Sequence, residues 1–352
     1  MMNAFSSFSS SCRSDRSSGP FTLICRRVIQ ETHDVKTFVF SPKSGQAAQF
    51  KAGQFIMLNL VIDGAPVMRN YSISSPPTRP GDLRITVKRV PGGLASNWLH
   101  DNLEQGSEIG IDGLSGGFNW DDLASERPLF LSGGSGITPV MSMLRTLADN
   151  GCDKDICFIH SARSSKDIIF REELEDLARD HCNFHIHVLC AKPEDKWRGP
   201  VGLVDESMLL KLAPDIRERS VYACGPEPYM KAIRGALHSI GLDPDRCHEE
   251  SFGGLTRLAP TSSANQAASV RFARSGIGHQ CRSTQTLLEI ARNVGLYLPS
   301  ACQQGICGTC RVLKLSGDVE TTDLGGLSAE DKAEGYVLAC CTRPLGEVTL
   351  DV

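Results

Sequence analysis

The sequence lacks long apolar runs and lacks an excess of basic charge. It has 352 residues, of which 41% are hydrophobic and 22% charged, and its formal net charge is -4. No stretch approaches the ~20 apolar residues of a membrane-spanning helix, so we expect no membrane segment. Nucleic-acid binding relies on clustered Lys and Arg that neutralise phosphates, and no such surplus is present. The composition is that of a soluble globular protein.

The sequence also lacks a cysteine framework of the kind that secreted proteins use. Most of its 14 cysteines stand singly among apolar neighbours, which predicts a reducing, cytoplasmic location. Residues 1–19 are rich in serine but have no apolar core of a secretory signal, and we expect a disordered tail. Arg13 and Arg16 would suit an organelle transit peptide, but Asp15 and the poor amphipathic pattern count against it.

The one regular cysteine pattern lies near the end of the chain. Its spacing, C-x4-C-x2-C followed later by a fourth cysteine, is the signature of a plant-type [2Fe-2S] cluster. Structural zinc fits the four-residue gap poorly, and a disulfide pair fits less well still. The four expected iron ligands are Cys302, Cys307, Cys310 and Cys340.

Residues next to these ligands support the same interpretation. Gly305 and Gly308 give the backbone the freedom to wrap the cluster sulfides. Cys341 follows Cys340 directly, and adjacent strand residues point to opposite faces, so we expect only Cys340 to face the cluster.

Residues 20–124 show short strand-like runs separated by Gly, Pro and Asp, which predicts an antiparallel barrel or sandwich. One of these runs carries Arg69, Tyr71 and Ser72, a cation, a ring and a hydroxyl that suit a phosphate-bearing flavin, although an exposed strand with a stray arginine is also possible. Further on, Gly92 and Gly93 open a short helix whose free amides can hold a pyrophosphate, or else form a plain hairpin turn.

Residues 125–252 alternate strands with helices, which predicts a parallel, doubly wound sheet. The first strand ends in the glycine-rich turn 133–136, with Pro139 near the start of the next helix, as in a phosphate-binding loop. Cys224, Gly225 and Pro226 follow a later strand, at the edge where such sheets bind ligands. A single cysteine at this position is also often just a small buried apolar residue.

Three histidines in this part, His181, His185 and His187, suggest a metal site, but alternating histidines on a strand more often form one solvated face. Residues 253–268 have the composition of a flexible linker. In residues 269–352 we expect a small sheet with one helix over 286–293, capped by Ser283 or Thr284.

Taken together, these motifs resemble the ferredoxin-NADP reductase superfamily joined to a plant-type ferredoxin. The resemblance implies three units: an antiparallel β-barrel for FAD, an α/β parallel-sheet domain for the nicotinamide, and a β-grasp [2Fe-2S] ferredoxin domain. Within the first, it implies that Arg69 binds the flavin phosphate, that Tyr71 packs on the flavin and that Ser72 lies near its reactive nitrogen. The pyrophosphate contacts implied are Gly92, Gly93 and Ser96.

The resemblance also assigns the nucleotide side. It implies that Cys224 lies beside the nicotinamide ring, that Ser72, Cys224 and Glu250 form the catalytic group, and that Phe252 covers the flavin. Arg163 and Lys166 stand where a 2′-phosphate of NADPH would bind, whereas likeness to oxygenase reductases favours NADH. The remaining nucleotide contacts implied are Gly133, Gly134, Gly136, Thr138, Pro139, Gly225 and Pro226.

The activity implied is electron transfer from NADH (or NADPH) through FAD and [2Fe-2S] to a partner protein. We expect a transient complex with a Rieske-type monooxygenase that acts on a quaternary amine such as glycine betaine. Two alternatives are a reductase for a hybrid-cluster protein and a non-enzymatic electron carrier or redox sensor. The nucleotide-binding motifs count against the carrier.

Overall fold

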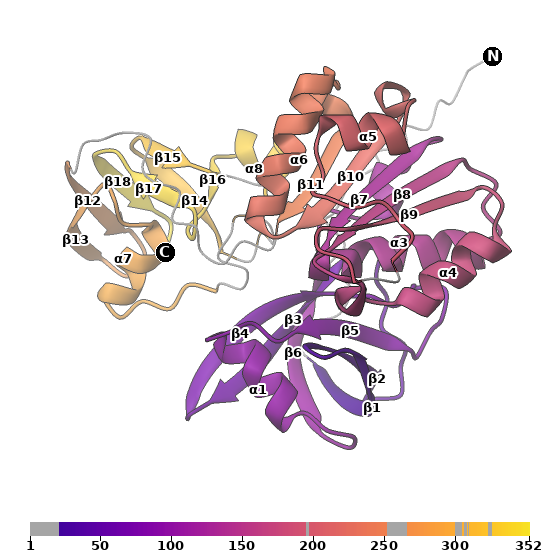
Figure 1. The fold of residues 1–352 in the computed structure, drawn as a ribbon. Coiled ribbons are helices and arrows are strands. Elements are labelled where there is room, and N and C mark those ends of the chain that lie inside the picture. Colours follow the sequence, from indigo (N-terminus) through magenta and orange to yellow (C-terminus); the bar gives the residue numbers. More distant parts are fainter. Residues whose placement is uncertain are drawn as a thin grey trace, which may run out of the picture.

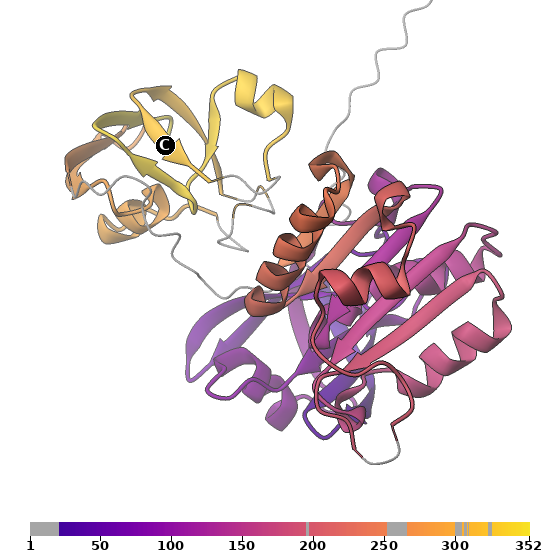
Figure 2. The ribbon, with the colours of Figure 1, turned by 45° about the horizontal axis from the view of Figure 1, so that its top comes forward.

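The computed structural model describes residues 21–194, 197–251, 266–299, 305, 308, 310–322 and 326–352. Figures 1 and 2 show three units in chain order: a curved antiparallel sheet, a parallel sheet flanked by helices, and a small separate sheet. This confirms the predicted fold class. Within the described ranges, no helix has the length and apolar character needed to span a membrane.

The first unit is a six-stranded antiparallel sheet in the order β4-β3-β6-β1-β2-β5. An antiparallel bridge between Ile73 and Ile85 brings the two edge strands together, which closes the sheet into a barrel. Alternate residues of the strands fill its interior, and helix α1 (Leu94–Asn102) packs against it through Leu99. The strands are β1 (Phe21–Thr32), β2 (Val35–Pro42), β3 (Phe55–Ile62), β4 (Ala65–Ser72), β5 (Leu83–Lys88) and β6 (Glu108–Ser115).

The second unit is a five-stranded parallel sheet in the order β11-β10-β7-β8-β9. Its central strands are apolar on both faces, because each face is covered by its own buried cluster. The strands are β7 (Pro128–Gly133), β8 (Ile156–Ala162), β9 (Phe184–Cys190), β10 (Ser220–Gly225) and β11 (Cys247–Ser251). The helices are α2 (Trp120–Leu123), α3 (Ile137–Asp149), α4 (Arg171–Asp180), α5 (Glu206–Leu212) and α6 (Glu227–Ile240).

Two element boundaries in this unit are set locally. Helix α4 begins only at Arg171, because Phe170 takes a left-handed backbone conformation with φ 59°, which a continuous right-handed helix does not contain. The segment around Glu250 is the edge strand β11.

The third unit is a sheet in the order β13-β12-β18-β14-β16 beside a two-stranded ladder, β15-β17. Its α7 is capped by Thr286, whose hydroxyl accepts from the Glu289 amide, so the expected caps at Ser283 and Thr284 were wrong. Strand β12 begins at Ala267, two residues inside the expected linker. The elements are β12 (Ala267–Phe272), β13 (Ile277–Arg282), α7 (Leu287–Asn293), β14 (Arg311–Ser316), β15 (Val319–Thr321), α8 (Ala329–Ala333), β16 (Tyr336–Leu338), β17 (Thr342–Pro344) and β18 (Glu347–Leu350).

Candidate redox site

Three residues from different parts of the chain meet where the barrel adjoins the parallel sheet. Ser72 ends strand β4 of the barrel, and its Oγ donates to Glu250 Oε2 at 3.2 Å. Glu250 lies on edge strand β11, directly paired in register with Cys224 of β10. All three side chains are buried. The structure therefore brings together the three residues for which the sequence implied a catalytic role.

Burial determines the protonation states at this junction. It raises the pKa of Glu250 to about 8, and the hydrogen bond from Ser72 opposes the shift without reversing it. Burial, with the nearby Glu250 carboxyl, also raises the pKa of the Cys224 thiol well above its usual range. Near pH 7 the group therefore consists of a neutral carboxylic acid, a neutral thiol and a hydroxyl. It offers polar contacts without a fixed charge.

The glycine-rich turn lies beside Cys224 and requires glycine for steric reasons. A Cβ on Gly136 would come within 2.1 Å of the Cys224 carbonyl oxygen. Gly133 and Gly225 both face the ring of Tyr229, and a Cβ on either would approach it to 2.6 Å or less. The turn thus packs tightly between two strand ends and leads into the amino terminus of α3, the geometry that binds pyrophosphates.

Other predicted nucleotide contacts lie in the same place. Gly134 has φ 52°, and Thr138 in the first turn of α3 donates its hydroxyl to the Ser135 carbonyl at 3.0 Å. Pro139 follows in that first turn, and Pro226 caps the amino terminus of α6. Tyr229 was missed from the sequence. Its signal was an aromatic residue in the first turn after Cys224-Gly225-Pro226.

A second glycine-rich turn, at the start of helix α1 on the barrel, carries flavin-binding residues predicted from the sequence. Gly92 turns with φ 71°, and a Cβ on Gly93 would lie 2.6 Å from the Ser96 hydroxyl, which itself accepts from the Val90 amide. Gly93 caps α1 without a side-chain hydrogen bond, so the helix presents backbone amides. These residues fit a dinucleotide pyrophosphate.

The strand that bears the flavin motif supplies a cation and a ring. The Arg69 guanidinium is exposed and donates to the Met68 carbonyl at 2.7 Å, and it forms no ion pair with the residues that the structure describes. Tyr71 is partly buried, and burial raises its pKa to about 12, so the phenol stays neutral. Phe252, expected to cover the flavin, lies outside the described residues.

In the third unit, Cys310 and Cys340 come together, both buried, with the Cys340 amide 3.5 Å from Cys310 Sγ. Cys302 and Cys307 lie outside the described residues. Cys341 donates its thiol to the Leu338 carbonyl. The strand argument for Cys341 was wrong in one respect, because Cys340 and Cys341 lie in the turn between β16 and β17.

Gly305 and Gly308 show why the cysteine loop needs glycine. Both have positive φ, and their Cα atoms approach Cys341 and the Gly326 carbonyl, with 2.8 Å to an added Cβ in each case. A pair of buried thiols beside a loop with this backbone fits cluster ligation.

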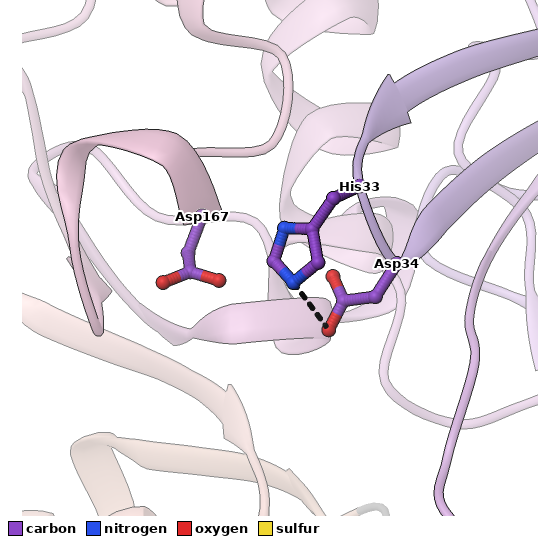
Figure 3. A group of neighbouring side chains, drawn as sticks. All are labelled: His33, Asp34 and Asp167. Atoms are coloured by element: carbon purple, nitrogen blue, oxygen red, sulfur yellow. Dashed lines mark ion pairs between the residues drawn. The ribbon is translucent and has the colours of Figure 1, made fainter.

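Arg163, expected at the 2′ position of the nucleotide, is already paired in this structure. It reaches Asp167 at 2.6 Å and Asp34 of the barrel at 3.1 Å, and Lys88 also contacts Asp34 at 3.1 Å. Figure 3 shows both carboxylates around His33. Two cations neutralise this group, which leaves little charge for a metal ion. Lys166 is likewise paired, with Glu194 at 2.6 Å.

The three histidines considered as metal ligands do not form a group in the described part of the chain. His181 stacks on Phe184 with ring centroids 4.7 Å apart, and His185 lies 3.5 Å from Asp155. The only candidate metal group found among the described residues is the one around His33.

Comparison with known proteins agrees with this arrangement. Family models match at residues 22–120 (oxidoreductase FAD-binding domain), 130–235 (oxidoreductase NAD-binding domain) and 271–345 (2Fe-2S iron-sulfur cluster binding domain). The glycine betaine monooxygenase reductase subunit of Pseudomonas aeruginosa is 45% identical, over 93% of this chain and 94% of that protein. The chain belongs to this family of reductases. It is an oxidoreductase whose cofactors are FAD, NAD and a [2Fe-2S] cluster.

Further relatives share the whole architecture. The stachydrine N-demethylase reductase subunit of Rhizobium meliloti is 39% identical, over 94% of this chain and 96% of that protein. The structure of phthalate dioxygenase reductase covers 95% of this chain and 98% of its own, with a TM-score of 0.61 and 24% identity. The latter similarity shows the shared fold.

Proposed function

We propose that this reductase takes electrons from NADH and delivers them, through FAD and the cluster, to a Rieske-type monooxygenase acting on a quaternary amine. The observation that carries the electron path is the convergence of Ser72, Cys224 and Glu250 at the junction of the flavin and nucleotide units. The proposed acceptor is supported by the names of the relatives, which are reductase subunits of glycine betaine monooxygenase and stachydrine N-demethylase.

When bound, the flavin supplies the chemistry that converts a two-electron hydride donor into the one-electron steps that an iron-sulfur cluster requires. The protein orients the reactants and excludes water. Gly136 allows the nucleotide turn to lie against the Cys224 carbonyl, so a dinucleotide held at this turn would have its nicotinamide end near the junction. The Ser72 hydroxyl donates to Glu250 and would contact the reactive edge of a bound flavin.

The neutral state of Glu250 matters for this role. A buried carboxylate next to the junction would oppose negative charge gained by the flavin, whereas a neutral acid does not. Neither Ser72 nor Cys224 exchanges atoms with the substrate in this scheme. Both position the reacting rings.

The preference for NADH is supported by the charges at the end of β8. Arg163 and Lys166 are the two bases expected to meet a 2′-phosphate, and both are paired with carboxylates. A 2′-phosphate would have to displace those partners or bring a negative charge next to Asp34 and Asp167. A free 2′-hydroxyl meets no such repulsion, and carboxylates accept its hydrogen bond.

We place the reaction in the cytoplasm. Cys25, Cys157 and Cys190 are buried and form no disulfide, which suits a reducing compartment. The acceptor would dock transiently, as is usual for electron-transfer partners.

The relay is tested by anaerobic reduction of the purified holoprotein. We expect NADH to bleach the flavin and cluster absorbance faster than NADPH does. Cys307→Ser is expected to abolish cluster absorbance and cytochrome c reduction while ferricyanide reduction by the flavin continues. Loss of both activities would contradict the order of the relay, and a strong NADPH preference would contradict the assigned nucleotide.

The acceptor is tested by reconstitution with purified oxygenase components. We expect NADH-dependent demethylation of glycine betaine or a related quaternary amine with a Rieske-type partner. If only a hybrid-cluster protein accepts the electrons, the proposed acceptor is wrong and the relay stands.

A further inference from the structure

Residues 72–75, at the end of the flavin motif, are held by side chains of helix α3 in the nucleotide unit. Their carbonyl groups accept hydrogen bonds from two side chains of α3: Arg145 donates through Nη1 to the Ser74 carbonyl, and Ser142 donates to the Ser75 carbonyl at 2.7 Å. The Ser74 amide donates to the Arg84 carbonyl of the barrel at 2.8 Å. The segment 72–75 is therefore fixed on one side by the barrel and on the other by α3.

Arg145 is an unusual residue for this position. Its side chain is 3% exposed, although arginine is rarely buried without a specific partner. Its other donors hold Glu173 of α4 in a two-bond pair, with Nε to Oε1 at 2.7 Å. The guanidinium also lies over the Phe170 ring, 4.6 Å from its centroid.

The surroundings of Glu173 favour its ionised form. Burial alone would raise the pKa of Glu173, yet the hydrogen bonds and charge of Arg145 hold it below its usual value. Arg145 is buried and Glu173 is half-buried, and the two-bond contact fixes the geometry of the pair. Arg145 therefore has little freedom to move, and neither does the carbonyl that it holds.

Helix α3 connects this contact with the nucleotide turn. Its amino terminus follows Gly136, which lies against the Cys224 carbonyl. Arg145 stands nine residues further on, about 13 Å along the helix axis. One rigid helix thus carries the nucleotide turn at its start and holds the segment after Ser72 by its middle.

We propose that Arg145 is a positioning residue for hydride transfer, setting the flavin-binding segment against the helix that carries the nucleotide turn. The inference rests on the proposed relay. Arg145 touches neither cofactor in this scheme; it acts through the Ser74 carbonyl and so on Ser72, two residues earlier. Displacement of reacting groups by about 1 Å lowers rates by up to ~100-fold, so a small shift of this segment has a measurable effect.

The test compares Arg145→Met and Arg145→Lys with Arg79→Met in the full-length holoprotein. Arg79 is a matched control, because it also joins barrel to α3, through a bidentate pair with Asp149, but does not contact segment 72–75. Flavin reduction by NADH is followed anaerobically by stopped flow. We expect Arg145→Met to lower the limiting rate at saturating NADH about 10-fold or more, with the apparent Kd for NADH within about twofold.

A second measurement is independent of turnover. Hydrogen exchange is followed in a peptide covering residues 72–75, with FAD bound and after its removal. We expect faster exchange there in Arg145→Met, partial restoration in Arg145→Lys, and no change in Arg79→Met. Cytochrome c reduction after photoreduction of the flavin should match that of the wild type, because those later steps do not use α3.

The outcomes are separable. If the wild type is not reduced by NADH, the proposed function fails. If the wild type is reduced but Arg145→Met slows flavin reduction no more than Arg79→Met does, the positioning role is refuted. If Arg145→Met loses FAD or fails to fold, the positioning role is judged from Arg145→Lys. A wild-type rate and a wild-type exchange pattern in Arg145→Lys would refute the proposal.

Discussion

Glu250 gives the sharpest prediction, because its carboxyl is buried with one hydrogen bond from Ser72. Burial raises its pKa in the folded protein to about 8, from 4.5 in an exposed chain. Between these two values the folded state binds more protons than the unfolded state. Stability contributed by this group is therefore full below about pH 4.5 and is lost as pH rises towards 8.

The size of the effect follows from the same two values. From pH 5 to pH 8 the linkage amounts to about 3 kcal/mol. For a body the size of the barrel and parallel sheet together, 1 kcal/mol corresponds to about 2–4 °C, so the expected change in Tm is roughly 6–12 °C. Glu250→Gln removes this pH dependence of stability, because the amide is uncharged at every pH and resembles the protonated acid.

The assay is thermal release of flavin fluorescence, measured for wild type and Glu250→Gln from pH 5 to pH 8. Other titrating groups affect both proteins alike, so the difference in Tm isolates Glu250. We expect the variant to match the wild type near pH 5 and to exceed it progressively towards pH 8. A difference in Tm that stays constant over this range would show that Glu250 is ionised throughout. It would refute the conclusion that the Glu250 carboxyl is neutral near pH 7.

Three other predictions follow from single contacts. Gly136→Ala should lower the free energy of unfolding, measured by chemical denaturation, by about 1–3 kcal/mol or more, because the new Cβ meets the Cys224 carbonyl at 2.1 Å. The control Gly235→Ala on α6, which has open space around it, should be neutral or stabilising in the same assay. The raised pKa of the buried Cys224 thiol predicts that it resists alkylation by iodoacetamide at pH 8 in the folded protein; rapid labelling there, located by mass spectrometry, would contradict it. Asp34→Asn should free Arg163 from one partner and raise kcat/KM for NADPH relative to NADH several-fold, and an unchanged ratio would argue against the charge-based preference.

Features that depend on neighbours in the chain could be predicted from the sequence. The alternation of strands and helices marks the parallel sheet, because the periodicity of apolar residues follows local geometry. The turn at Gly133–Gly136 was identified for a similar reason, because a run of glycines between a strand and a helix is a local motif. That a Cβ there would meet Tyr229 or the Cys224 carbonyl was visible only in the structure. The capping box at Thr286 shows the limit of such signals, because several nearby residues have suitable side chains and only one has the right geometry.

The sequence alone determined the order of three units, the glycine turns and the spacing of the cysteines, all of which are encoded over a few residues. Only the tertiary structure decided which distant groups meet. Ser72 and Glu250 are 178 residues apart, and their contact and the raised pKa of Glu250 arise from packing of the barrel against the sheet. The same packing buries Arg145 and pairs Arg163 with Asp34, so the charge that each presents depends on a neighbour that no local pattern reveals.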